Sequence, residues 1–235
     1  YILPKIHKQS ASPPGRPIIS GNGSITENLS IYVDTYIKPL VLNLPSYIRD
    51  TMDILNKFQD VEWDQDNMMF VTLDVTSLYT CIDKRFGLMA LEWALDGRKA
   101  SFKDHNDILI QMVDIILMNN FFLYESQWYQ QLCGTAMGSV VAPSYAGLFM
   151  GWYEKIHVWG PLAQEWSRYI NYWGRYIDDV IVIWTGTAAQ MLDYLTYLNT
   201  NEFNVHFTMN MHPTRITFLD VELYAAHNKI QSTLF

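Results

Sequence analysis

The stretch GRYIDDVIVIW, residues 174–184, sets two short apolar runs on either side of an acidic pair. Four β-branched residues, 180–183, follow Asp178 and Asp179 directly. Apolar, β-branched runs around a short polar break predict a β-hairpin whose tip carries both carboxylates. Adjacent carboxylates repel each other and are costly to remove from water, so their position needs an explanation. The simplest one is a polar turn, because aspartate is a common turn residue.

A third acid has the same local setting. In FVTLDVTSLY, residues 70–79, Asp74 comes at the end of a hydrophobic strand, where an uncompensated charge would again be costly. If strand ends deliver three carboxylates to one edge of a sheet, a divalent cation would neutralise them. Mg²⁺ prefers oxygen ligands, and two such ions support phosphoryl transfer by activating one oxygen and stabilising the leaving one. The acids therefore indicate a site for two Mg²⁺ ions, with Mn²⁺ as a substitute.

The composition bounds the class of protein. A chain of 235 residues that is 49% hydrophobic can bury a sizeable core as one domain. Its formal charge of −8 predicts no general affinity for nucleic acids or anionic membranes. The first 26 residues are the exception, because they hold Lys5, Lys8 and Arg16 and no acid. Cys81 and Cys133 lack the spacing of a zinc site or a disulfide framework, and fit a reducing compartment.

Residues 126–153 carry no charge, which raises the question of a membrane span. Gln, Gly, Ser and Pro residues dilute the hydrophobicity of this stretch, so a buried helix after a glycine-rich turn is favoured. No signal peptide is visible, and the chain opens on Tyr1 without a methionine. We therefore expect a piece of a longer protein that is intracellular, located in the nucleus and not bound to membranes.

Periodicity and turn residues predict alternating helices and strands. Helices are expected over 27–58 with interruptions at Pro39 and Pro45, and over 84–96, 104–118 and 188–199. A glycine-rich turn followed by a helix is expected within 134–156. Strands are expected over 16–20, 68–75, 203–209, 215–224 and 229–235, with hairpins at 119–131 and 172–184. Because several strands meet through tight turns, the pattern predicts an α+β fold with an antiparallel sheet.

Short blocks along the whole chain resemble, in the same order, the reverse transcriptases of Penelope-like retroelements. These blocks are YILPKIHK (1–8), GRPIIS (15–20), SLYT (77–80), GTAMGS (134–139), YIDD (176–179) and TFLDVEL (217–223). Asp74 with its following aromatic, the GTAMGS turn and YIDD are similar to motifs A, B and C of reverse transcriptases. Any single block would be weak support, whereas the ordered set is specific.

The resemblance implies a right-hand polymerase whose antiparallel palm sheet is backed by helices, in a single catalytic domain over 1–235. The fingers would come from about 1–50 and 100–131, and the palm from about 51–99 and 132–235. The family also has a thumb and, in many members, a nuclease domain. Neither fits within 235 residues, so we expect both to lie in a longer chain.

The resemblance also implies roles for single residues. Asp74, Asp178 and Asp179 would be the catalytic acids, and with Val75 they would hold the metal ions. Asp74 and Asp178 would hold both ions, while Asp179 would be more peripheral. The positions implied for the incoming dNTP are Arg16, Lys5, Tyr79, Met137 and Gly138. The positions implied for the RNA template and DNA primer are Gly134, Tyr176 and Lys8.

The roles implied for Arg16 and Tyr79 each have a physical basis, and each residue also has a purely structural interpretation. A guanidinium at Arg16 suits a triphosphate because its donors bind phosphate bidentately; otherwise Arg16 is an exposed loop cation. A bulky ring at Tyr79 would clash with a 2′-hydroxyl, so the product is expected to be DNA. Otherwise Tyr79 is a core aromatic that follows a strand.

The chain departs from the family pattern at several positions. Met137 stands where many relatives have glutamine, and Cys81 stands where asparagine is expected. No lysine or arginine lies between Trp184 and Pro213 to protonate the leaving pyrophosphate, which leaves His206, His212 or water. Asp220 is a fourth acid at a strand, but it matches the primer-grip side of the pattern and is assigned no metal.

Three functions remain open at this point. The leading hypothesis is an RNA-directed DNA polymerase, in which a primer 3′-hydroxyl attacks the α-phosphate of a dNTP. The second is an RNA-templated RNA polymerase on the same palm, which the ring of Tyr79 disfavours. The third is a catalytically silent fragment that binds nucleic acid or a partner, which the three intact acids disfavour.

Overall fold

A computed structural model of the chain describes residues 2–4, 15–98 and 102–234. Over this described part, the chain forms two compact units. Unit 1 comprises Tyr1–Pro39 and Tyr79–Phe149, and unit 2 comprises Leu40–Leu78 and Met150–Phe235. Residues 79–99 and 132–149, expected in the palm, belong to unit 1, and residues 40–50, expected in the fingers, belong to unit 2. The assignment of fingers and palm stays a prediction.

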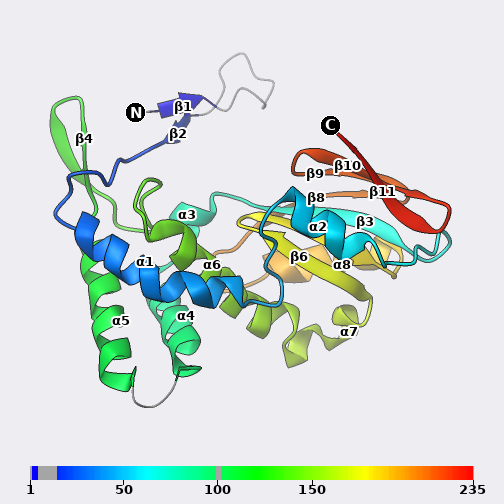
Figure 1. The fold of residues 1–235 in the computed structure, drawn as a ribbon, viewed down its shortest axis with the longest axis horizontal. Helices are drawn as coiled ribbons and strands as arrows, with labels where there is room; N and C mark the ends of the chain where they lie inside the picture. Colours follow the sequence, from blue (N-terminus) through cyan, green and yellow to red (C-terminus); the bar gives the residue numbers. More distant parts are fainter. Residues whose placement is uncertain (1, 5–14, 99–101, 235) are drawn as a thin grey trace. The chain divides into compact units, whose positions relative to one another are not determined.

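Unit 2 is built on antiparallel sheets (Figure 1). One sheet has the strand order β6-β7-β3-β8, formed by β6 (Ile170–Tyr176), β7 (Asp179–Trp184), β3 (Met69–Val75) and β8 (Phe207–His212). The other has the order β11-β10-β9, formed by β11 (Lys229–Leu234), β10 (Val221–Ala226) and β9 (Arg215–Phe218). The predicted α+β class with an antiparallel sheet is confirmed.

Both faces of the β6-β7-β3-β8 sheet are covered, which explains the almost unbroken apolar runs of its central strands. On one face, Phe70 and Ile183 are register partners and belong to one hydrophobic cluster with Phe58 of α2 (Thr51–Phe58). On the other face, Trp184 stacks on Tyr194 of α8 (Ala188–Asn199), with ring centroids 5.6 Å apart. The hairpin of β6 and β7 is thereby fixed from both sides.

Short helices connect the strands of unit 2. Helix α6 (Ala142–Tyr153) starts in unit 1 and ends in unit 2, where it continues as the π-helix η2 (Glu154–Val158). The 3₁₀-helix η3 (Pro161–Ala163) and α7 (Gln164–Ser167) lead to β6. A capping box of Thr187 and Gln190 starts α8, whose bounds match the expected 188–199.

Unit 1 is mainly helical. It contains the first part of α6 and the helices α1 (Glu27–Leu42), which extends into unit 2, α3 (Leu78–Cys81), α4 (Lys84–Asp96) and α5 (Lys103–Met118). Helices α4 and α5 lie side by side (Figure 1). Two hairpins complete the unit, formed by β1 (Ile2–Pro4) with β2 (Gly15–Pro17), and by β4 (Phe121–Tyr124) with β5 (Gln127–Gln130).

Three expected elements differ from the structure for identifiable reasons. The helix expected over 27–58 ends at Leu42, and α2 begins only at Thr51, where the Asp50 side chain caps it. The strand expected over 215–224 is two strands, because Leu219 has φ +51° and turns the chain. The strand expected at 203–209 starts at Phe207, since the Asn201 side chain accepts hydrogen bonds from the amides of 203 and 205.

The uncharged stretch 126–153 ends in the buried second half of α6. Of the helices in the described ranges, none has the length and apolar character that crossing a bilayer requires.

Candidate active site

Asp74 and Asp179 are direct register partners across β3 and β7. Opposed positions of an antiparallel pair project to the same face, with Cβ atoms roughly 4.5–5.5 Å apart. The pairing of β3 with β7 therefore places two acids that are far apart in the sequence next to each other. Asp74 is exposed and Asp179 is half-buried.

Asp178 occupies the two-residue turn that joins β6 to β7. Its neighbour in the turn, Ile177, has φ +54°. Turns with a positive φ at the first central position normally carry glycine, and a β-branched residue there is an outlier. Such strain costs on the order of 1–3 kcal/mol and persists only where surrounding contacts hold it.

Contacts from both neighbouring strands hold this turn. The amide of Val75, at the end of β3, donates a hydrogen bond of 3.1 Å to the carbonyl oxygen of Asp178. Arg175 Nη1 donates to the carbonyl oxygen of Ile177 at 3.0 Å. Val75 thus contributes a backbone contact beside the acids, while its side chain is buried.

The three acids interact electrostatically. Burial, with smaller contributions from the charges of Asp178 and Asp74, raises the pKa of Asp179 to about 6. We call Asp74, Asp178 and Asp179 the carboxylate cluster. Like charges held this close create a local negative potential that a cation would relieve.

A polar cavity of about 180 Å³ lies beside the carboxylate cluster. Among its lining residues, Asp74 is the register partner of Thr208 and Thr72 is the register partner of Asn210, so these four share a face of the sheet. Asp179 and Thr217 also line it. Carboxylate, hydroxyl and amide oxygens therefore surround a space that is large enough for several water molecules.

The chemistry of this donor set suits a hard divalent cation, because all its members are oxygen ligands. Within the described ranges, however, no three His, Cys, Asp or Glu side chains are already arranged around one metal position. Mg²⁺ commonly takes only one or two carboxylates and completes its shell with water and substrate phosphates. The opposed pair Asp74 and Asp179, with Asp178 alongside, fits that mode of binding.

The raised pKa of Asp179 predicts a pH-dependent cost in stability. The pKa lies near 6 when the chain is folded, against an ordinary 3.8, so the folded state holds this proton more tightly. The contribution of this group therefore falls as pH rises from about 4 to 6 and stays unfavourable above that range. Asp179→Asn should raise the unfolding free energy at pH 7.5 by about 1 kcal/mol, a value reduced for the solvent access of the side chain.

Urea unfolding at pH 5 and pH 7.5 measures this effect, which should be smaller at the lower pH. The exposed turn residue Asp66 gives the matched control, because Asp66→Asn makes the same chemical change outside the cluster. Equal stability changes in the two variants would contradict the account of Asp179.

In unit 1, the GTAMGS turn packs directly on α3. Gly134 has φ +71°, and a Cβ atom there would lie 2.1 Å from the carbonyl oxygen of Tyr79. The amide of Thr135 donates to that same oxygen at 2.7 Å, and the amide of Gly134 donates to the Ile82 carbonyl at 3.0 Å. The structure thus brings together Tyr79 and Gly134, two residues that the sequence singled out separately.

The GRPIIS block reaches the same turn. Gly138 has φ +147°, and a Cβ atom there would lie 2.1 Å from the carbonyl oxygen of Ile19. The amide of Gly21 donates to the Gly138 carbonyl at 3.2 Å. The half-buried Met137 precedes this contact. Glycine is required because backbone meets backbone at this point.

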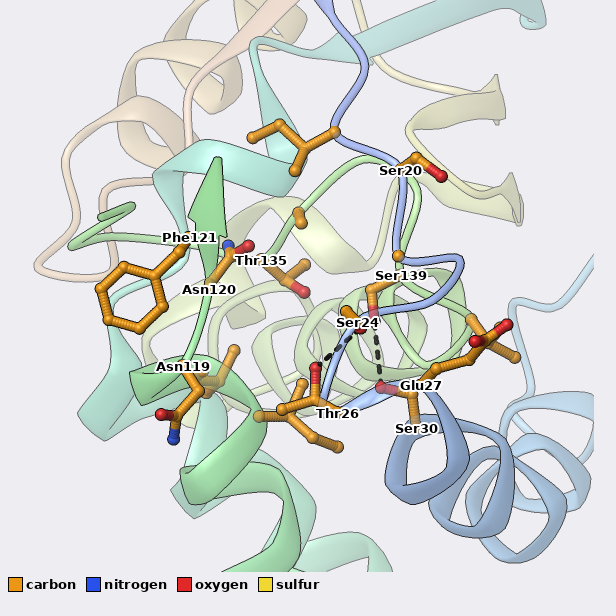
Figure 2. Close-up of a pocket in the computed structure, with 16 residues that line it drawn as sticks. Ser20, Ser24, Thr26, Glu27, Ser30, Asn119, Asn120, Phe121, Thr135 and Ser139 are labelled. Atoms are coloured by element: carbon orange, nitrogen blue, oxygen red, sulfur yellow. Dashed lines mark hydrogen bonds between the residues drawn. The ribbon is translucent and has the colours of Figure 1, made fainter. Parts of the chain in front are cut away.

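Beside this junction lies a cleft lined by hydroxyl-bearing and apolar side chains (Figure 2). Ser30 and Ser139 place their Oγ atoms 3.3 Å apart, and Ser24 and Thr26 are similarly close, at 3.3 Å. Asn119, Asn120 and Glu27 add further polar groups to the lining. No cleft was expected here, because its lining comes from three separate segments, 19–30, 116–121 and 135–140. The GRPIIS and GTAMGS blocks each supply part of it, and the Ser/Thr content around 20–30 is a further signal.

The structure says less about the other residues that the sequence analysis singled out. Lys5 and Lys8 lie outside the described residues, and Arg16 is described only as a backbone position of β2 opposite Leu3. Tyr176 packs against the hydrophobic cluster of unit 2. Burial raises the pKa of the Cys81 thiol to about 11, which disfavours the thiolate form at neutral pH.

The two histidines differ in position. The carbonyl oxygen of His206 accepts a hydrogen bond from Thr76, two residues after Asp74, whereas His212 is the register partner of Phe70, toward the other end of β3. Of the two, His206 is therefore nearer to the acids along the sheet. Asp220 accepts a hydrogen bond from Thr51 at 3.3 Å and is exposed.

Sequence comparison with known proteins finds no relative. No family model matches the chain. No curated protein matches it either.

Comparison with solved structures does find similar folds. Telomerase from Candida tropicalis, truncated from its C-terminal domain, has a TM-score of 0.61 at 11% identity, over 86% of this chain and 45% of that one. Telomerase from Candida albicans, in complex with a fragment of telomeric RNA, has a TM-score of 0.64 at 9% identity, over 88% and 38%. The RNA-dependent RNA polymerase of BmCPV at the elongation state has a TM-score of 0.63 at 13% identity, over 90% and 20%.

The chain thus spans less than half the length of each of these proteins. At such low identity the likeness concerns the fold alone. The chain has the mixed helix and antiparallel-sheet fold of polymerase fingers and palm.

Proposed function

We propose that this chain is the catalytic core of an RNA-directed DNA polymerase that joins a dNTP to a primer 3′-hydroxyl. The observation that carries the proposal is the register of β3 and β7, which sets Asp74 opposite Asp179 at the strained turn of Asp178. Three carboxylates at the edge of an antiparallel sheet, within a polymerase fold, support phosphoryl transfer better than any other chemistry of this chain.

Two Mg²⁺ ions, when bound, would polarise the phosphoryl oxygens and lower the pKa of the attacking hydroxyl. The residues themselves have three tasks in the proposal. Asp74 and Asp179 supply opposed carboxylate oxygens, and Asp178 adds negative charge beside them. The backbone bond from Val75 to Asp178 holds the turn against β3. The polar cavity next to Asp74 provides hydrogen-bonding groups for water.

We further propose that the polymerase belongs to a Penelope-like retroelement, acts in the nucleus, and uses an RNA template with a DNA primer. The ordered blocks from YILPKIHK to TFLDVEL support this assignment. In the proposal Arg16 and Lys5 contact the triphosphate, Lys8, Gly134 and Tyr176 contact template or primer, and Met137 and Gly138 contact the incoming nucleotide. A thumb and a nuclease domain would belong to a longer chain.

Primer extension on an RNA template in the presence of Mg²⁺ tests the proposal. We expect the 235-residue chain to add the dNTP that complements each template base, more efficiently when the chain is extended by a thumb. Addition that does not follow the template, or none with either chain, would contradict the proposed function.

The fold likeness to a viral RNA-dependent RNA polymerase favours RNA synthesis as the second candidate. The ring at Tyr79, five residues after Asp74 in the sequence, disfavours it because the ring would exclude a 2′-hydroxyl. A parent chain that prefers rNTPs over dNTPs would support this second candidate.

Tyr79→Ala should relax the choice of sugar. Without the ring, we expect the ratio of kcat/KM for dNTP over rNTP to fall by roughly 100-fold, a loss of differential transition-state binding of about 3 kcal/mol. Single-nucleotide incorporation with matched dNTP and rNTP measures the ratio. Tyr79→Phe is the matched control and should retain the preference, because it keeps the ring. An unchanged ratio in Tyr79→Ala would remove Tyr79 from this role.

A further inference from the structure

A buried ion pair lies near the carboxylate cluster in unit 2. Arg175 Nε, on β6, is 2.7 Å from Oε1 of Glu154, and the two side chains are only 3% and 5% exposed. Removing two charges from water is costly, and apolar residues in place of such a pair are often equally stable or more stable. The pair therefore calls for an explanation other than stability.

The guanidinium of Arg175 also reaches the acidic turn. Its Nη1 donates a hydrogen bond of 3.0 Å to the carbonyl oxygen of Ile177. That oxygen belongs to the peptide that links Ile177 to Asp178, and Ile177 holds a φ of +54° that β-branched residues rarely adopt. One side chain thus connects a buried carboxylate to the peptide that sets the direction of Asp178.

Glu154 is itself held firmly. Its carboxylate accepts hydrogen bonds from Trp173 Nε1, at 3.1 Å, and from the Ser46 hydroxyl. Its carbonyl oxygen accepts the π-type bond from the amide of Trp159, at 2.9 Å, where α6 passes into η2. This π-turn forms the C-terminal end of the helix, and π-turns in helices are frequent at functional positions.

The backbone of Arg175 is fixed as well. Its amide donates to the carbonyl of Ser46 at 2.6 Å, and its carbonyl accepts from the amide of Ile48 at 2.9 Å. A side chain anchored at its backbone and at its Nε has little freedom left at Nη1. The guanidinium can therefore hold the Ile177 carbonyl in one place.

We propose that Arg175, anchored by its ion pair with Glu154, is a positioning residue. It holds the strained turn at Ile177 and thereby orients Asp178 and Asp179 for cation binding. This inference rests on the proposed function. Arginine suits the task because its planar guanidinium presents several donors in a fixed arrangement. The ammonium of a lysine would lack that fixed second donor, and Ile177 would then relax toward a negative φ.

Binding of Mn²⁺ alone, followed by electron paramagnetic resonance on the whole chain, tests the inference. Arg175→Lys keeps a positive charge beside Glu154 and should raise the Mn²⁺ dissociation constant roughly tenfold, as outer-shell substitutions at metal sites do. Tyr153→Phe is the control for lost stability, because it removes the buried hydrogen bond from Tyr153 to the Leu198 carbonyl. It should lower the melting temperature without weakening Mn²⁺ binding.

A rescue variant separates positioning from general stability. Asparagine adopts a positive φ far more readily than isoleucine, so Ile177→Asn should restore most of the Mn²⁺ affinity in the Arg175→Lys background. Parent-like affinity in Arg175→Lys, an equal loss in Tyr153→Phe, or no rescue by Ile177→Asn would each overturn the inference.

Two further measurements keep the test decisive. If Arg175→Lys fails to fold, Glu154→Gln with Arg175→Met removes both charges together, and the same tenfold loss is expected, since no unpaired buried charge remains. If the parent chain itself does not bind Mn²⁺, the proposed function fails. Amide hydrogen exchange at residues 177–179 then still tests whether Arg175 holds the Ile177 turn. Exchange should be faster in Arg175→Lys than in the parent chain, both without metal, and an unchanged rate would contradict this role of Arg175.

Discussion

Asp74→Asn should reduce RNA-templated dNTP incorporation by about 100- to 1,000-fold, the usual cost of removing a group that stabilises charge in the transition state. The amide has nearly the same shape as the carboxylate but carries no charge for a divalent cation. Asp74 is exposed and stands opposite Asp179, so the substitution also removes a like-charge repulsion. The melting temperature should therefore be retained or slightly raised. Single-turnover primer extension and thermal unfolding measure the two effects.

The control for Asp74→Asn is Asp66→Asn, in the exposed turn before β3 begins. It removes one negative charge from the same unit and should leave the incorporation rate close to that of the parent. If Asp74→Asn kept more than a tenth of the parent rate, the carboxylate cluster would not be the catalytic centre.

Gly134→Ala should cost about 3–5 kcal/mol of unfolding free energy, the size expected when a buried backbone contact is forced apart. The residue has φ +71°, and its new Cβ atom would lie 2.1 Å from the Tyr79 carbonyl oxygen and 2.6 Å from the Thr80 Cα atom. These neighbours are backbone atoms and cannot move aside by changing rotamer. Urea unfolding followed by tryptophan fluorescence measures the loss.

Gly23 provides the comparison for Gly134. Its φ is +72°, almost the same, but nothing lies within 4 Å of a Cβ atom built there. Gly23→Ala should therefore cost only the conformational part, about 1–2 kcal/mol. Equal losses in the two variants would show that backbone conformation, and not the contact with α3, makes glycine necessary at 134.

Much of the fold could be predicted because its signals are local. Helix α4 runs over 84–96 as expected, and α8 begins at a capping box that can be read from Thr187 and Gln190. The hairpin at 172–184 follows from β-branched runs on both sides of a polar break. By contrast, the expected strand 215–224 is divided into β9 and β10 by a positive φ at Leu219, and leucine is not a residue type that predicts a positive φ.

The acids of the candidate site and their meeting at one edge of a sheet could be predicted from the sequence, but the register that pairs them could not. That Asp74 ends a strand is a local feature, whereas its pairing with Asp179 depends on the register of strands distant in the chain. The contact between Gly134 and Tyr79 is non-local in the same way. Ile177 and Glu154 could not be predicted at all: isoleucine is atypical in a left-handed position, and nothing near Glu154 in the sequence points to Arg175.

The most direct test of the central claim is whether Asp74 and the Asp178-Asp179 turn surround one cation. Fe²⁺ can replace Mg²⁺, and with ascorbate and peroxide it generates hydroxyl radicals that cut the backbone next to the bound ion. The account predicts cuts near residue 74 and near residues 178–179 in the same chain, both suppressed by Mg²⁺ and both lost in Asp179→Asn. Cuts at only one of the two segments, or cuts that Mg²⁺ does not suppress, would contradict it.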